Sequence, residues 1–169
     1  MEDFNETEFL EYAKAYMEGE NSTYDDTKFS HYKKAFLSFK KDNAKVSWNW
    51  CSFIFGGWHL LYRKAYVGGA IALAITYFLS GTYVAPLICW ILAGLFGDYF
   101  IYKGFNDKLT EAMSQYQTKE DRIAFLKRSG GINKWVVALG IVITIITVIL
   151  IAIIIGGLAL ISNTSGIYY

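Results

Sequence analysis

The residues that could carry acid–base, nucleophilic or metal chemistry are few and widely spaced. His31 and His59 are the only histidines, and Cys51 and Cys89 are the only cysteines. A zinc site needs such residues in closely spaced pairs, and these four do not supply that spacing. The chain also lacks a serine or cysteine nucleophile motif, a phosphate-binding glycine loop and a pair of carboxylates inside an apolar segment. We therefore predict a non-enzymatic protein with no catalytic residue, no cofactor and no metal ion.

Asp98 borders a long apolar stretch and carries the main hypothesis about a polar site. It follows residues 65–97, which hold no charged side chain, and Arg63 and Lys64 precede the same stretch. If the stretch folds as a hairpin, both of its ends return to one level. We therefore predict an ion pair between Asp98 and Arg63 or Lys64, and the alternative is a functional charge on a transport pathway. For His59 we favour a polar interfacial side chain over a proton-linked role.

An aromatic segment at residues 46–64 precedes this hairpin. Tryptophan and tyrosine lie there between Lys45 and the Arg63–Lys64 pair, a composition typical of a helix at the depth of lipid headgroups. A crossing by residues 46–62 is the alternative, but it leaves no room before the next helix. The predicted lipid-interface residues are Trp48, Trp50, Trp58, Tyr62, Arg63 and Lys64.

The same stretch resembles the domain of unknown function 2628, a family of small bacterial membrane proteins. The resemblance rests on Trp48-Asn49-Trp50, Phe53-Ile54-Phe55-Gly56, Trp58 and Tyr62-Arg63-Lys64, and on the exit Gly97-Asp98-Tyr99-Phe100-Ile101-Tyr102. It covers about residues 46–109; Asp98 stands where the family usually has Asn, and Gly57 where Pro often follows the glycine. The resemblance implies a bacterial cytoplasmic-membrane location and no established biochemical activity.

Two uncharged blocks set the predicted membrane segments. Residues 135–161 form an apolar run, longer than the about 20 residues that cross a bilayer as a helix. Residues 65–102 form a hairpin of two short helices, about 65–79 and 83–97, broken at Ser80-Gly81-Thr82. At about 22 Å each, these helices are short for a bilayer core of about 30 Å, so the hairpin is either spanning or re-entrant.

The remaining segments predict folded helices. Phe9, Tyr12, Ala13 and Tyr16 share one face of a helix at 8–18, and Phe29, Tyr32, Phe36 and Phe39 share one face of a helix at 28–41. Farther on, Phe105, Leu109, Met113 and Tyr116 recur at helical spacing. Thr118 with Asp121 resembles a capping box, and Gly130-Gly131 ends the helix that follows. The acidic first helix and the basic second one are expected to pack as a hairpin or to meet across protomers.

Composition and charge give the class and the orientation. Apolar residues make up 54% of the 169 residues and charged residues only 18%, which favours a membrane protein. All 16 lysines and arginines lie before residue 65 or between residues 103 and 134. By the positive-inside rule these parts are cytoplasmic and the C-terminus lies on the opposite face. Nine acids and one base in residues 1–26 argue against a secretory signal there.

The prediction is therefore an all-α helical integral membrane protein of the bacterial inner membrane. Its segments are a cytoplasmic amphipathic helical segment at 1–45, an interfacial aromatic helix at 46–64, a transmembrane or re-entrant hairpin at 65–102, a cytoplasmic helical connection at 103–134, a transmembrane helix at 135–162 and a short tail at 163–169. We expect a non-enzymatic accessory or scaffold protein. Its partners are membrane lipids and either further copies or another membrane protein, and the net charge of +1 gives no reason to expect nucleic acid. The alternative is a small transporter or a channel- or pore-forming subunit.

Overall fold

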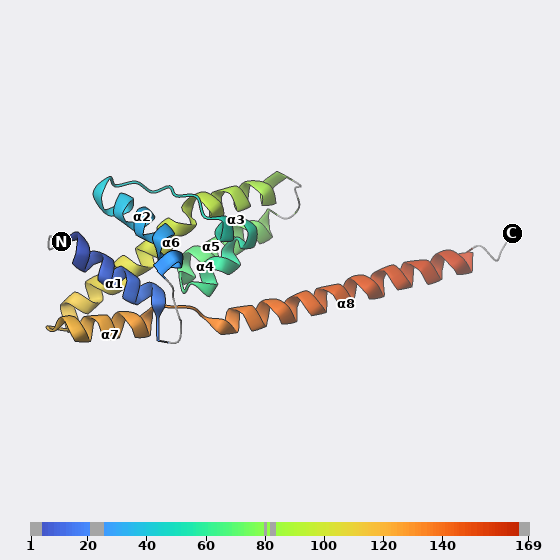
Figure 1. Ribbon diagram of the computed structural model, residues 1–169. Helices are drawn as coiled ribbons and strands as arrows, with labels where there is room; N and C mark the ends of the chain where they lie inside the picture. The colour runs from blue at the N-terminus through green and yellow to red at the C-terminus, as the bar shows by residue number, and fades with distance from the viewer. Residues whose placement is uncertain (1–4, 21–25, 80, 82–83, 166–169) are drawn as a thin grey trace. The chain divides into compact units, whose positions relative to one another are not determined.

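The computed structural model describes residues 5–20, 26–79, 81 and 84–165, and within them it contains α-helices and no strand (Figure 1). The chain divides into two units, Met1–Asn133 and Lys134–Tyr169. The described helices of the first unit are α1 (Glu6–Glu18), α2 (Asp26–Lys41), α3 (Trp50–Phe55), α4 (Gly57–Tyr62), α5 (Tyr66–Phe78), α6 (Val84–Gln115) and α7 (Lys119–Ser129). The second unit holds α8 (Lys134–Ser165). The predicted all-α class is confirmed.

The buried core of the first unit forms around the second half of α6. The helices α1, α2 and α7 pack against this half, and the rings of Phe36 and Phe105 stack 5.6 Å apart at its centre. The apolar faces predicted for the first two helices are both buried in this core, which confirms those predictions. The core residues are Phe9, Tyr12, Ala13, Tyr16, Met17, Phe29, Tyr32, Ala35, Phe36, Phe39, Leu60, Ala65, Ile101, Phe105, Leu109, Ala112 and Leu126.

Ion pairs on the surface of this core connect the acidic first helix to basic residues of other elements. Glu6 pairs with Lys41 of α2, and Glu11 pairs with Lys119 of α7 at 2.6 Å. The predicted packing of an acidic helix against a basic one is therefore found within a single chain. Because all four side chains are exposed, these pairs each contribute little to stability.

The other part of the first unit exposes apolar side chains. These side chains belong to α3, α5 and the first half of α6; Val67 is 74% exposed and Phe78 82% exposed. Glycines bring the helices close together here, because a Cβ at Gly68 would lie 2.6 Å from the Phe100 ring of α6. The first unit thus has two parts. One is a buried core covered by helices with charged surfaces, and the other is a closely packed hairpin with an exposed apolar surface.

Two predicted boundaries differ from the structure. The expected single helix at 46–64 is instead a non-helical segment at 43–49, extended at Asn49, followed by α3 and α4, which break at Gly56 with a φ of +52°. The second hairpin helix does not stop near Gly97 but runs on to Gln115. It continues because Ile101, Phe105 and Leu109 keep the helical period and are buried in the core.

The ends of α7 and the course of α8 follow the sequence pattern. The Thr118 side chain accepts a hydrogen bond from the backbone N–H of Asp121, and Gly130 is the C-cap, as predicted. The 32 residues of α8 form one helix, about 48 Å long. The apolar stretches of α6 and α8 each meet the length and composition of a membrane-crossing helix.

Candidate functional site: a buried polar network around Asp98

The network lies where the two surfaces of the first unit meet along α6. The part of α6 before Asp98 holds no charged residue, whereas the part after it holds Lys103, Asp107, Lys108 and Glu111. Asp98 itself is fully buried. A buried carboxylate is costly unless hydrogen-bond donors surround it, so its partners define the site.

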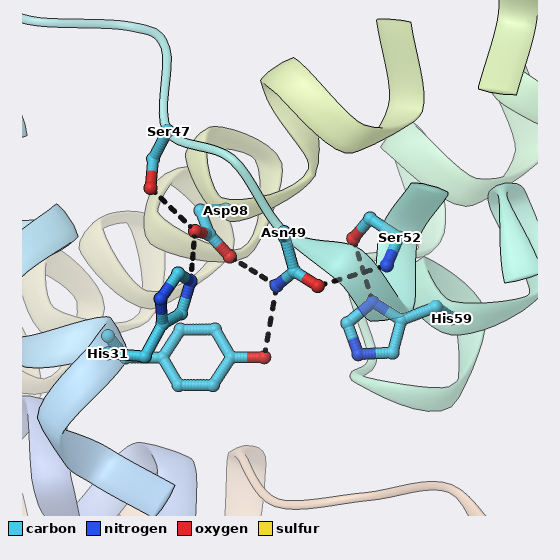
Figure 2. A network of polar contacts seen from close by, with 7 residues as sticks. His31, Ser47, Asn49, Ser52, His59 and Asp98 are labelled. Atoms are coloured by element: carbon cyan, nitrogen blue, oxygen red, sulfur yellow. Dashed lines mark hydrogen bonds and ion pairs between the residues drawn. The ribbon is translucent and has the colours of Figure 1, made fainter. Parts of the chain in front are cut away.

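Three side chains from two other elements donate hydrogen bonds to this carboxylate (Figure 2). His31 Nε2 of α2 lies 2.7 Å from Oδ2, and Ser47 Oγ lies 2.9 Å from the same oxygen. Asn49 Nδ2 donates to the other oxygen, Oδ1, at 2.5 Å. Both carboxylate oxygens are therefore occupied, which satisfies the buried charge.

The extended segment before α3 delivers two of these donors. The backbone N–H of Ser47 donates to the Leu95 carbonyl of α6 at 3.0 Å, and that of Asn49 donates to the Gly94 carbonyl at 2.8 Å. In an extended chain, residues two apart point the same way, so Ser47 and Asn49 both face Asp98. Small residues on this face of α6 leave room for the segment, because Gly94 is in contact with Trp48 and Phe53.

Asn49 also links the carboxylate to a second histidine. Its side-chain oxygen caps α3 by accepting from the Ser52 N–H at 2.9 Å. The Ser52 hydroxyl lies 2.8 Å from His59 Nδ1 of α4, and which of the two donates depends on the histidine tautomer. The network therefore runs from α2 through α6 and α3 to α4.

The two histidines have opposite electrostatic environments. The hydrogen bond to Asp98 raises the pKa of His31 above its ordinary 6.5, although partial burial opposes the increase. Burial lowers the pKa of His59 to about 4, and the positive charge of Arg63 contributes in the same direction. His31 is thus held toward its charged form by a carboxylate, and His59 is neutral.

The structure places the predicted ion-pair residues in the same region with other partners. Arg63 is 5% exposed; its Nη2 lies 3.4 Å from the Met17 carbonyl oxygen, and its guanidinium stands over the Tyr32 ring. Asp98 bonds to His31, Ser47 and Asn49. The direct Asp98–Arg63 pair stays a prediction.

The predicted lipid-interface residues do not form one set. Trp48 and Trp50 are exposed and pack edge to face, with ring centres 5.2 Å apart. Trp58, Tyr62 and Lys64 are half-buried. Arg63 is buried, with contacts to Met17 of α1 and Tyr32 of α2. Among the predicted residues, Trp48 and Trp50 are therefore the exposed ones; Phe55, which was not predicted, is 61% exposed in the same segment.

Sequence reasoning missed four members of the network: His31, Ser47, Asn49 and Ser52. A signal existed for Ser47 and Asn49, since they are polar residues two apart that alternate with exposed Val46 and Trp48. His31 gave no signal, because 67 residues separate it from Asp98. Its role follows only from the packing of α2 on α6.

Ser52 beside His59 has the spacing of a nucleophile and its base. Ser52 is fully buried and packs on Gly97. Among the described residues, no group of three or more His, Cys, Asp or Glu side chains could hold a metal ion.

Comparisons with protein-family models, with curated proteins and with solved structures found no match to this chain.

Proposed function

We propose that the protein is a non-enzymatic scaffold or accessory protein of the bacterial cytoplasmic membrane, with α1, α2 and α7 on the cytoplasmic side. The observation that carries this proposal is the division of the first unit into an apolar-surfaced hairpin and a charged helical core. Lipid solvates the first surface and water the second. The basic residues near the charged core suit the cytoplasmic face.

The exposed side chains of the hairpin support insertion into lipid. Val67, Phe78 and Val84 are each more than 60% exposed, and they belong to a surface of mostly large aliphatic and aromatic residues on α5 and α6. Leaving such side chains in water costs about 1.5–3 kcal/mol each. A surface of this extent is typical of proteins that bind membranes or partners.

Two features favour a scaffold over a transporter. The buried polar atoms around Asp98 bond to one another, so the network holds α2, α3, α4 and α6 together. In the described part of α8, the hydroxyls of Thr144 and Thr147 bond to carbonyls of their own helix, Gly140 and Ile143. Neither feature provides polar groups for a moving solute.

The proposal is tested in two steps with the purified full-length chain. We expect the protein to resist extraction from membranes at alkaline pH and to form a defined oligomer in detergent, as measured by light scattering. We expect the ion flux across vesicles that contain the protein to be no greater than the flux across protein-free vesicles. A soluble protein would contradict the membrane location. Ion flux that increases with the number of copies per vesicle would establish the alternative, a channel or transporter subunit.

A further inference from the structure

We propose that the first part of α2, residues 26–35, is a pH-sensitive cover over the buried polar network, and that it opens more often when His31 loses its proton. This goes beyond the proposed function and does not depend on a membrane location. The Asp98 side chain is 0% exposed, whereas the His31 side chain, 2.7 Å away, is 46% exposed (Figure 2). Water can therefore exchange a proton with His31 while the carboxylate stays buried.

The Asp98 carboxylate depends on His31 for a charged hydrogen-bond donor. Its other two donors, the Ser47 hydroxyl and the Asn49 side-chain amide, are neutral. When His31 loses its proton, the donors bonded to the carboxylate among the described residues are all neutral. Hydrogen bonds from a charged donor are roughly twice as strong as those between neutral groups. Loss of the proton therefore weakens the contact that joins α2 to α6.

The acid that acts on His31 is Asp98. Near His31, α2 itself, the end of α1, residues 43–49 and the end of α4 carry the charged residues Lys28, Lys34, Lys14, Glu18, Lys45 and Arg63. Glu18 is the acid among these, and it pairs with Lys127 of α7 at 3.4 Å. On α6, burial raises the pKa of Tyr102 above 10, so this residue is neutral. The hydrogen bond and the charge of Asp98 raise the pKa of His31, and partial burial opposes them.

The second part of α2, residues 36–41, is held by aromatic contacts. The Phe36 ring stacks on Phe105 at 5.6 Å, and the Phe39 ring packs on Tyr102 at 5.4 Å. These contacts do not require a charged side chain, so this part stays attached to α6 when His31 is neutral. In the first part, Phe29 is also buried, so the open form is a minor population that increases when the His31 contact weakens.

Opening of residues 26–35 would expose two buried polar side chains, Arg63 and Asn49. The Arg63 guanidinium lies 5.4 Å from the centre of the Tyr32 ring, and Asn49 Nδ2 lies 3.5 Å from the Tyr32 hydroxyl. Both side chains belong to residues that are only 5% exposed. Because Tyr32 lies in the part of α2 that opens, its displacement brings a cation and an amide to the surface at alkaline pH.

The first test measures backbone hydrogen exchange of the full-length chain in detergent, by mass spectrometry, at pH 6 and pH 8.5. Protection factors remove the intrinsic pH dependence of exchange, so they report opening. We expect the protection of residues 26–35 to fall about five- to tenfold at pH 8.5, as a charged hydrogen bond becomes a neutral one, and that of residues 36–41 to stay constant. His31→Gln should show no fall, and the matched control Lys33→Gln should retain it.

A second test measures the exposure of Arg63 with an arginine-specific dicarbonyl reagent. Modification of Arg63 is divided by that of Arg128, whose side chain is 74% exposed, because this ratio cancels the pH dependence of the reagent. We expect the ratio to rise several-fold between pH 7 and pH 8.5 in wild type and to stay constant in His31→Gln. Constant protection of residues 26–35 in wild type, an equal fall in residues 36–41, a constant Arg63 ratio or an unchanged pH response in His31→Gln would overturn the inference.

Discussion

The contact between His31 and Asp98 makes stability depend on pH at a single residue. Because the carboxylate raises the pKa of His31 above 6.5, charged His31 stabilises the folded state. This contribution is complete below pH 6.5 and is lost as the pH rises through the raised value. We therefore expect the stability difference between wild type and His31→Gln to shrink at alkaline pH.

Thermal unfolding in detergent between pH 6 and pH 9 checks this prediction. Lys33→Gln is the matched control, because it removes an exposed positive charge from the same helix without touching Asp98. A gap between wild type and His31→Gln that stays constant across this range would show that the charge on His31 does not contribute.

His59 has the opposite dependence. Burial lowers its pKa to about 4, so His59 is protonated at a lower pH in the folded state than in the unfolded state. Its neutral form stabilises the fold above pH 6.5, and this contribution, about 3 kcal/mol when complete, is lost as the pH falls toward 4. We expect His59→Asn, which keeps a polar atom near Ser52, to lose less stability than wild type between pH 7 and pH 4.5. Equal losses in the two proteins would contradict the prediction.

At this site the sequence was enough to identify the buried acid but not its hydrogen-bond partner. Asp98 was identifiable because an acid beside an uncharged stretch needs a partner. The partner was not identifiable, because the sequence offers several donors and only the packing of α2 on α6 selects His31. Arg63 contacts Met17 and Tyr32, and its predicted pairing with Asp98 stays a prediction.

At the scale of elements, Gly97 controls how closely α3 approaches α6. A Cβ at this position would collide with the Ser52 side chain, which holds His59. We expect Gly97→Ala to destabilise the protein by about 1–3 kcal/mol, the usual cost of overpacking. Gly140→Ala in α8 is the matched control, since its Cβ meets nothing within 4 Å.

Chemical denaturation of both alanine variants provides the comparison. The two substitutions gain the same helix propensity, so the difference between them isolates the contact with Ser52. If both variants were equally stable, the close approach of α3 to α6 would not be required for the fold.

The sequence pattern predicted the buried helix faces better than the helix boundaries. The apolar faces of α1 and α2 were predictable, because a buried helix face must repeat every 3–4 residues. The break at Gly56 was not, since a run of aromatic residues suits one helix as well as two. The end at Gly97 was wrong because glycine there serves close packing on Ser52 rather than termination.

For the whole molecule, the mean hydropathy and the net charge conceal how far the apolar and charged parts of the chain are separated. The mean hydropathy of +0.26 and the net charge of +1 describe a mildly apolar, nearly neutral chain. The structure resolves this into a hairpin with apolar surfaces, a charged helical core and the apolar helix α8. The first unit thus carries an exposed apolar surface of its own.

The first unit should therefore bind membranes without α8. We expect a chain that ends at Asn133 to remain in the membrane fraction after alkaline washing, because α5 and the first half of α6 still insert. Replacing Val67 and Ile71 of α5, both exposed, with Asp should release this shortened chain. The same two substitutions in the full-length chain are the control, where α8 should keep the protein bound. Release of the unsubstituted shortened chain would mean that α8 alone anchors the protein and that the hairpin surface serves another partner.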